Sequence, residues 1–235
     1  MAWRVQTKTS DVVQTLRLAF GDEFIDSITH EQLESFVAQV RTHRYRKGEA
    51  IYHEDDLPGD NYIVSEGWVK HQQVSATGGQ YTHRLSPVGD YFGRMAGSRR
   101  VGGTVALTEC ALLVVERSVF FDFISLARAP IAYLMQRQAQ RSADLLRKIH
   151  DLAFLNVPMR LASVLLEVSQ PTDVQGHSKL VVPDYFNQTE IAHLVGASRE
   201  SVNQWLKHFA ERQWISIESK HIVIDDEAAL RQSME

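Results

Sequence analysis

A pair of short helices joined by a tight turn is the pattern that most constrains the fold of this chain. It is indicated in QTEIAHLVGASRESVNQWLKHFAER, residues 188–212. In the first segment, apolar residues recur at helical spacing at Ile191, Leu194 and Val195. Gly196 adopts the positive φ of a turn easily because it has no Cβ, and Ser198 is a favourable N-cap for the second segment. The stretch is therefore expected to form two packed helices.

The second of these segments separates into an apolar stripe and a polar face. The stripe has the i, i+3, i+4, i+7 spacing of a helix with one buried side, and consists of Val202, Trp205, Leu206 and Phe209. The opposite face carries Arg199, Glu200, Asn203, Gln204 and Lys207. Such side chains match base edges in the major groove, where a helix-turn-helix presents the first turns of its second helix. An amphipathic helix pair of an ordinary all-α domain has the same pattern and stays the alternative.

Two short β-forming runs after the helices favour DNA binding. WISIE and HIVID, residues 214–218 and 221–225, are separated by the polar pair SK. Two such runs around a polar tip are typical of a hairpin. A hairpin directly after a helix-turn-helix is the wing of a winged helix.

Length and charge describe an ordinary globular protein. The 235 residues suit two domains, each large enough for its own core. The chain is 44% hydrophobic and 23% charged with a formal net charge of −4, so its overall charge does not indicate nucleic acid. Residues 188–212 hold three basic and three acidic side chains, so phosphate contacts depend on local geometry and helix N-termini.

Cysteine usage and hydropathy limit the class of protein further. Cys110 is the only cysteine, which excludes an intramolecular disulfide, a cysteine-rich zinc site and a four-cysteine iron–sulfur cluster built by one chain. No stretch approaches the roughly 20 apolar residues of a membrane span, and the N-terminus lacks a signal-peptide pattern. We expect a cytoplasmic protein with no membrane partner.

The N-terminal half is predicted to be a β-roll preceded by two short helices. The helices are indicated in DVVQTLRLAF and HEQLESFVAQV, residues 11–20 and 30–40. From Tyr45 to about Arg117 the chain breaks into short β-branched and aromatic runs separated by glycines. Regular turn spacing of this kind indicates a jelly-roll or β-roll sandwich.

A long helix from Pro130 to Leu155 follows, about 39 Å long at 1.5 Å per residue. Within it an unbroken heptad register runs through Ile131, Met135, Gln138, Ser142, Leu145, Ile149 and Leu152. This register favours a two-stranded parallel seam; packing within one domain is the alternative. Leu134 and Leu146, beside the seam, are expected to face the β-roll. Pro158 marks the hinge that ends the helix.

Taken together, these segments closely resemble the CRP/FNR family of transcription regulators from about Phe24 onward. The most specific parts are RKGEAIYHEDDLPGDNYIVSEGWVK, residues 46–70, and the helix-turn-helix. The resemblance implies an α+β fold. An N-terminal β-roll (double-stranded jelly-roll) sensor domain spans residues 1–125, a dimerisation helix and hinge residues 126–157, and a winged helix-turn-helix residues 158–235. It also implies a homodimer that regulates transcription from an inverted-repeat promoter site, with double-stranded DNA and RNA polymerase as partners.

The resemblance also assigns DNA-contacting positions. Arg199, Glu200 and Gln204 correspond to the three base-reading positions, and Ser198 to a phosphate contact. The cyclic-AMP receptor protein has arginine where this chain has Gln204, so we expect a different preferred half-site. The complete set of expected DNA-binding residues is Thr189, Ser198, Arg199, Glu200, Asn203, Gln204 and Lys207.

The effector site departs from the family pattern. Members that bind cyclic AMP have a glutamate where this chain has Arg94, and an Arg-Ser pair where it has Val101-Gly102. Leu145-Leu146 replaces the polar pair that reads adenine. Each lost charge-assisted contact removes about 1.5–3 kcal/mol, so cyclic AMP is not expected to be the effector. Arg94, Arg99 and Arg100 lie in this segment, and they are either surface residues or bind an anion other than cyclic AMP. The candidate pocket consists of Arg94, Arg99, Arg100, Gly102, Gly103, Thr104, Leu145 and Leu146.

Other functions find less support in the residues. Haem needs an axial ligand, for which His53, His71, His83 and Cys110 are candidates, but no cofactor is expected. A cupin-like metal site needs a His-x-His pair, which the chain lacks, and no metal site is predicted. No catalytic motif occurs, so an enzyme is not expected. A β-roll interaction or metal-binding module that has lost DNA binding remains the alternative.

Overall fold

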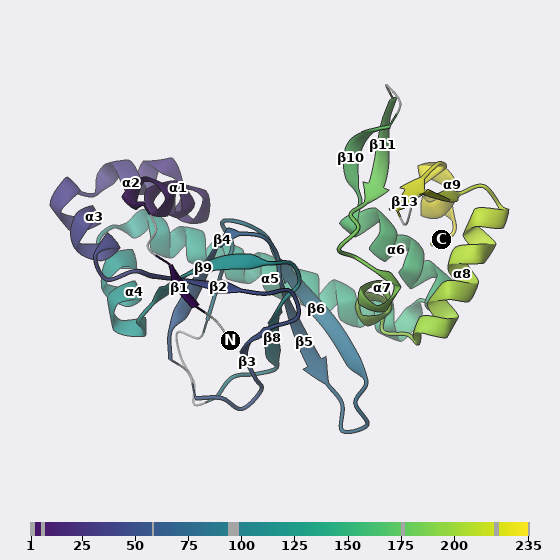
Figure 1. The fold of residues 1–235 in the computed structure, drawn as a ribbon, viewed down its shortest axis with the longest axis horizontal. Coiled ribbons are helices and arrows are strands. Elements are labelled where there is room, and N and C mark those ends of the chain that lie inside the picture. The colour runs from purple at the N-terminus through teal and green to yellow at the C-terminus, as the bar shows by residue number, and fades with distance from the viewer. Residues whose placement is uncertain are drawn as a thin grey trace. The chain divides into compact units, whose positions relative to one another are not determined.

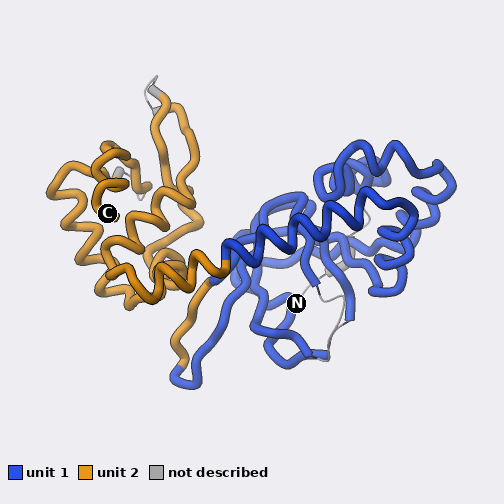
Figure 2. The backbone as a smooth tube through the Cα atoms, turned by 180° about the vertical axis from the view of Figure 1, so that it is seen from behind, with its two compact units in different colours: residues 1–77, 83–144 blue, residues 78–82, 145–235 orange. Residues whose placement is uncertain are grey.

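A computed structural model of the protein describes residues 3–5, 8–57, 59–93, 99–174, 177–218 and 221–234. The chain divides into two units (Figure 2). The first unit comprises residues 1–77 and 83–144, and the second comprises residues 78–82 and 145–235. The long helix α5 (Arg128–Phe154) passes from one unit into the other at residues 144 and 145.

The first unit is a β-roll with helices gathered at one end (Figure 1). Its N-terminal part contains β1 (Trp3–Val5), α1 (Thr9–Phe20), α2 (Asp22–Ser27) and α3 (His30–Val37). The roll is made by β2 (Arg41–Tyr45), β3 (Ala50–Tyr52), β4 (Asn61–Glu66), β5 (Val69–Val74), β6 (Gln80–Ser86), β7 (Tyr91–Phe92), β8 (Gly103–Ala106) and β9 (Cys110–Val115). One antiparallel sheet has the order β1-β2-β9-β4-β7 and the other β3-β8-β5-β6.

Two apolar clusters stabilise this unit. All six residues of β9 are buried, because β9 lies between β2 and β4 and is covered on both faces. One cluster contains aromatic side chains of α1 to α3 and of α4 (Arg117–Ile124), such as Phe20, Phe36 and Phe123, with the rings of Phe36 and Phe123 stacked at 3.7 Å. The other fills the roll and includes Tyr62 and Phe92. The predicted β-roll is therefore confirmed.

Several elements were missed by the sequence pattern because tertiary pairing forms them. Strand β2, RTHRY, has no apolar alternation, yet it pairs with β9 over its whole length and buries Thr42 and Tyr45. β1, α2, β7, β8 and α4 (Arg117–Ile124) were likewise not predicted. These segments are short, and their local signals are weak.

Helix α5 runs from Arg128 to Phe154, close to the predicted bounds. All seven heptad positions are exposed or partly exposed, with Ile131 at 43% and Ile149 at 61%. Leu134 is buried in the core of the first unit, whereas Leu146 belongs to the second unit and is 67% exposed, so its contact with the β-roll stays a prediction. A helix advances about 100° per residue, and twelve residues therefore rotate Leu146 by about 120° from Leu134.

The second unit surrounds α6 (Val157–Val168), which is capped by Asn156 and has Pro158 in its first turn. It continues with β10 (Gln170–Val174), β11 (His177–Val182), α7 (Gln188–Val195), α8 (Arg199–Glu211), β12 (Ile215–Glu218), β13 (His221–Ile224) and α9 (Glu227–Gln232). Its antiparallel sheet has the order β10-β11-β13-β12. The β12–β13 hairpin confirms the predicted wing, whereas β10, β11 and α9 were not predicted. Among the described residues no single helix is long and apolar enough to span a membrane, although α4 and α5, bent by 113° at their junction, together reach such a length.

Candidate nucleic-acid interface and sensor core

The predicted helix-turn-helix is formed by α7, a turn and α8. Asn187 caps α7 by accepting hydrogen bonds from the N–H groups of Thr189 and Glu190. Gly196 ends α7 in the left-handed region at φ +67°, the conformation for which glycine is favoured. Ser198 caps α8, its Oγ accepting from the Ser201 N–H at 3.2 Å. Local capping chemistry therefore determines where each helix begins.

Helix α8 packs its apolar stripe into the second unit. Val202, Leu206 and Phe209 are at most 2% exposed, and Ile191 and Val195 of α7 are buried with them. Trp205 is only half-buried, so the fully buried stripe is narrower than predicted. The stripe fixes which face of α8 points outward.

The outer face of α8 carries most of the predicted DNA-contacting side chains. Of these, Arg199, Glu200, Gln204 and Lys207 are exposed, and Thr189 at the start of α7 and Ser198 before α8 lie at the surface with them. Among the described residues, the side chains of Arg199, Glu200 and Gln204 have no hydrogen-bond or ion-pair partner. They are therefore available to an external ligand.

Asn203 departs from this pattern. It is half-buried, and its Oδ1 is buried with no hydrogen-bond partner in the described part of the chain. It lies three residues before buried Leu206, about 60° around the helix, so it borders the core and not the middle of the outer face.

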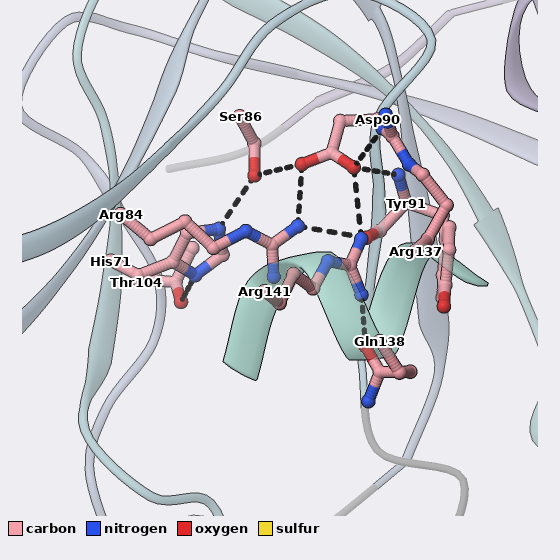
Figure 3. A network of polar contacts seen from close by, with 9 residues as sticks. All are labelled: His71, Arg84, Ser86, Asp90, Tyr91, Thr104, Arg137, Gln138 and Arg141. Atoms are coloured by element: carbon pink, nitrogen blue, oxygen red, sulfur yellow. Dashed lines mark hydrogen bonds and ion pairs between the residues drawn. The ribbon is translucent and has the colours of Figure 1, made fainter. Parts of the chain in front are cut away.

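In the first unit, a buried carboxylate contacts three arginines (Figure 3). Asp90, 4% exposed, lies just before β7. Its Oδ2 accepts from Arg84 and its Oδ1 from Arg137 and Arg141, at 2.8 and 2.9 Å. Arg141 also donates to the Tyr91 carbonyl at 2.6 Å. The network joins α5 to the β-roll.

The charge state of this network follows from its geometry. Burial alone would raise the pKa of Asp90, but the Arg84 and Arg141 guanidiniums outweigh that effect and hold the pKa below its usual range. Asp90 Oδ2 also accepts from the Ser86 hydroxyl at 2.7 Å. The carboxylate is therefore ionised at neutral pH.

His71 extends the network into the roll. Its Nδ1 lies 2.9 Å from Thr104 Oγ1 and its Nε2 lies 2.8 Å from Ser86 Oγ. Burial, with added repulsion from Arg84, holds the pKa of His71 well below its usual range, so the ring is neutral. Both ring nitrogens are hydrogen-bonded, and His71 is not available as the axial haem ligand considered from the sequence. In the described segments, no group of three or more His, Cys, Asp or Glu side chains could hold a metal ion.

The candidate effector-pocket residues are only partly brought together. Arg100 is 4% exposed, donates from Nη2 to the Asp60 carbonyl at 2.9 Å, and places its guanidinium 4.2 Å from the Tyr52 ring centroid. Its Nε and Nη1 find no hydrogen-bond partner in the described ranges. The surface interpretation is therefore wrong for Arg100, because the strands of the roll enclose it. Arg99, by contrast, is exposed and donates to the Asp55 carbonyl.

The remaining pocket candidates divide between the two units. Gly102 directly precedes β8, Gly103 begins it, and Thr104 in the same strand is buried against His71. At Gly102, with φ +77°, an added Cβ would lie 2.8 Å from a backbone oxygen. Leu145 and Leu146 belong to the second unit and are 44% and 67% exposed. Arg94 lies outside the described residues.

Comparison with known proteins settles the family. Residues 42–126 match the cyclic nucleotide-binding domain and residues 159–233 the Crp-like helix-turn-helix domain. A CRP-like cAMP-activated global transcriptional regulator of Mycobacterium tuberculosis is 30% identical over 84% of this chain and 90% of its own length. The chain belongs to the CRP/FNR family of transcription regulators. The family match and the structure together confirm the predicted α+β fold.

Solved structures of the CRP/FNR family share this fold. TTHA1359, a transcriptional regulator of the CRP/FNR family from Thermus thermophilus, is 26% identical with a TM-score of 0.67, covering 82% of this chain and 97% of that chain. FixK2 from Bradyrhizobium japonicum is 21% identical with a TM-score of 0.72, covering 82% and 96%. The chain is thus a CRP/FNR-type regulator with a helix-turn-helix DNA-binding domain, and the family consists of regulators, not enzymes.

The sequence pattern did not reveal the buried ion-pair network of the first unit. Arg84, Asp90, Arg137 and Arg141 were not singled out, because they are far apart in sequence and form no local motif. A weak signal existed: Arg137 and Arg141 are spaced i, i+4 on one face of the predicted long helix.

Proposed function

We propose that this protein is a homodimeric, sequence-specific regulator that binds an inverted-repeat promoter site through α8. One observation carries the proposal: Arg199, Glu200 and Gln204 are exposed at the N-terminal end of α8 and unpartnered among the described residues. Arginine offers two donors to guanine, glutamate accepts from cytosine, and glutamine pairs with adenine. Three different polar groups on two adjacent turns suit a distinct base sequence.

Phosphate contacts come from the start of each helix in this proposal. Thr189 and Ser198 lie at the N-termini of α7 and α8, where backbone N–H groups and the helix dipole attract anions. Lys207 adds an exposed positive charge two turns along α8. Asn203, half-buried, contributes after a side-chain rotation. These contacts orient the helix but carry no sequence information.

The dimer is proposed to form along α5. Its seven heptad positions include Ile131, Leu145, Ile149 and Leu152, all more than 40% exposed, and apolar side chains in that register bury each other in a parallel two-stranded coil. Regulators of this family typically act as dimers. In this proposal residues 1–125 sense, residues 126–157 dimerise, and residues 158–235 bind DNA and meet RNA polymerase in the cytoplasm.

Cyclic AMP is proposed not to control the protein, although the Mycobacterium tuberculosis relative is named as cAMP-activated. Leu145 and Leu146 offer no hydrogen bond to an adenine, and Val101-Gly102 offers no charge to a phosphate. Asp90 already accepts hydrogen bonds from Arg84 and Arg141, so the charges of those two arginines are balanced without an anionic effector. The protein then acts without an effector or with another one.

One observation favours a different anionic effector. Arg100 is enclosed in the roll with Nε and Nη1 unpartnered in the described segments, and buried N–H donors without a hydrogen-bond partner are costly. An anion in the roll would satisfy both nitrogens. Calorimetric screening of anions against wild type and Arg100→Gln tests this second candidate.

Selection of genomic fragments by the purified protein, with no ligand and with added cyclic AMP, tests the main proposal. We expect the same inverted repeat to be enriched in both samples. No enrichment in either sample would mean either that an effector other than cyclic AMP is required or that the chain is an interaction module that has lost DNA binding. Enrichment only with cyclic AMP would overturn effector independence but keep the DNA-binding assignment.

A further inference from the structure

One side chain in the second unit contacts the ends of two helices at once. Arg160 lies in the first turn of α6. Its Nε donates to the Val195 carbonyl at 2.8 Å, and its Nη2 approaches the Gly196 carbonyl at 3.4 Å. Its Nη1 donates to the Leu155 carbonyl at 2.8 Å. The first two carbonyls form the end of α7, and the third directly follows the last residue of α5.

These carbonyls are the acceptors that a helix leaves unsatisfied at its C-terminus. They carry the negative end of the helix dipole, so one guanidinium stabilises two such ends. The planar guanidinium directs its donors in a fixed fork, and the two helix ends are therefore held at a defined separation. A lysine would keep the charge but has one nitrogen, and it cannot form the same fork.

Side-chain packing at the same turn provides a second, independent contact. A Cβ added at Gly196 would lie 3.1 Å from Leu152 Cδ2 and 3.3 Å from Tyr81 Cδ2, so these side chains already contact the turn. Leu152 belongs to the last turn of α5. The turn between α7 and α8 is thus linked to the end of α5 in two ways, through the hydrogen bonds of the Arg160 guanidinium and through the apolar side chain of Leu152.

We propose that Arg160 is a positioning residue for DNA recognition, which holds the helix-turn-helix at a fixed placement on the end of α5. The inference rests on the proposed dimer along α5 and on α8 as the reading helix. In that dimer, the placement of each turn on its α5 determines the separation of the two α8 helices. Arg160 therefore determines which half-site spacing the dimer accepts, without contacting DNA.

The test compares full-length wild type with Arg160→Lys on duplexes that carry one half-site or two half-sites at varied separations. Wild type should prefer one separation. Losing one charged hydrogen bond of the fork should weaken the preferred two-site duplex by about tenfold and flatten the spacing preference. Binding to a single half-site should change by less than about twofold, because α8 itself is unaltered. Arg231→Lys is the matched control, since Arg231 pairs with exposed Glu227 of its own helix.

A distance measurement keeps the inference testable even where the variant binds DNA poorly. Cys110 is the only cysteine and is buried, so a spin label at Lys207→Cys reports one exposed site on each α8. The label-to-label distance in the dimer should have a narrow distribution when Arg160 is retained and a clearly broader one when Arg160→Lys is added.

Two outcomes separate failure of this inference from failure of the proposed function. A wild-type dimer with a preferred spacing, and an Arg160→Lys variant with the same spacing preference and distance distribution, would overturn the inference alone. Equal losses on one-site and two-site duplexes would also overturn it, since that pattern means general damage to the domain. A wild-type monomer, or no preference for paired half-sites, would overturn both.

Discussion

Neutralising Asp90 should destabilise the first unit more than neutralising a surface carboxylate. Asp90→Asn keeps the side-chain shape but leaves Arg84 and Arg141 beside a neutral amide. Breaking one partner of a buried ion pair costs about 3–5 kcal/mol. The side chains of the three arginines are 18–39% exposed, so solvent screens part of this cost. We therefore expect a loss of about 3 kcal/mol, the lower end of that range.

Urea unfolding at pH 7, followed by circular dichroism, measures this loss. Asp26→Asn is the matched control, because Asp26 pairs with Arg17 at the surface, where the two side chains are 64% and 37% exposed. That substitution should change the free energy of unfolding by at most about 1 kcal/mol. The comparison therefore isolates the effect of burial on a carboxylate–arginine contact.

The loss should also depend on pH in a defined direction. The folded pKa of Asp90 lies below its unfolded value of about 3.9, so its charge contributes stability above that pH. The contribution disappears as pH falls through the folded pKa, and the gap between wild type and Asp90→Asn should narrow below about pH 4. A gap under about 1 kcal/mol at pH 7, or one that does not narrow in acid, would contradict a stabilising role for the ionised Asp90.

Three further predictions concern the dimer, the contacts with DNA phosphates and the effector. Leu145→Lys combined with Ile149→Lys should give monomers in sedimentation velocity, because like charges replace apolar contacts in the seam; an unchanged dimer would rule out this seam. Lys207→Ala should weaken binding to all DNA sequences alike and reduce the slope of log binding constant against log salt concentration by about one. An effect confined to one base pair would contradict a phosphate contact by Lys207. Calorimetry with millimolar cyclic AMP should give no saturable heat, whereas a micromolar dissociation constant would overturn the effector proposal.

Local sequence signals were sufficient for the helix-turn-helix. The cap at Ser198, the turn at Gly196 and the stripe through Val202 and Phe209 each depend on residues within one or two turns. The chain therefore specifies these elements locally, and both helices form within the predicted stretch, on either side of the predicted turn. The long helix was predictable for the same reason.

Contacts between distant residues were not predictable. Strand β2 exists because Arg41–Tyr45 pairs with β9, far along the chain. For Arg100 the surface alternative was wrong, because the roll buries its side chain against Tyr52. The network around Asp90 combines β6, β7 and α5, and no short window of sequence contains all of its members. The DNA-contacting roles and the domain boundaries at residues 125 and 157 stay predictions.

A protein–DNA double-mutant cycle tests base reading by α8 most directly. Arg199→Ala and wild type would each be measured on the selected site and on a site with the contacted guanine replaced in both half-sites. Each change alone should cost about 1–3 kcal/mol per half-site, and the second change should add little once the first is made, because both remove the same contact. Independent, additive losses, or an Arg199→Ala variant with unchanged affinity and base preference, would contradict the assignment of α8 as the reading helix.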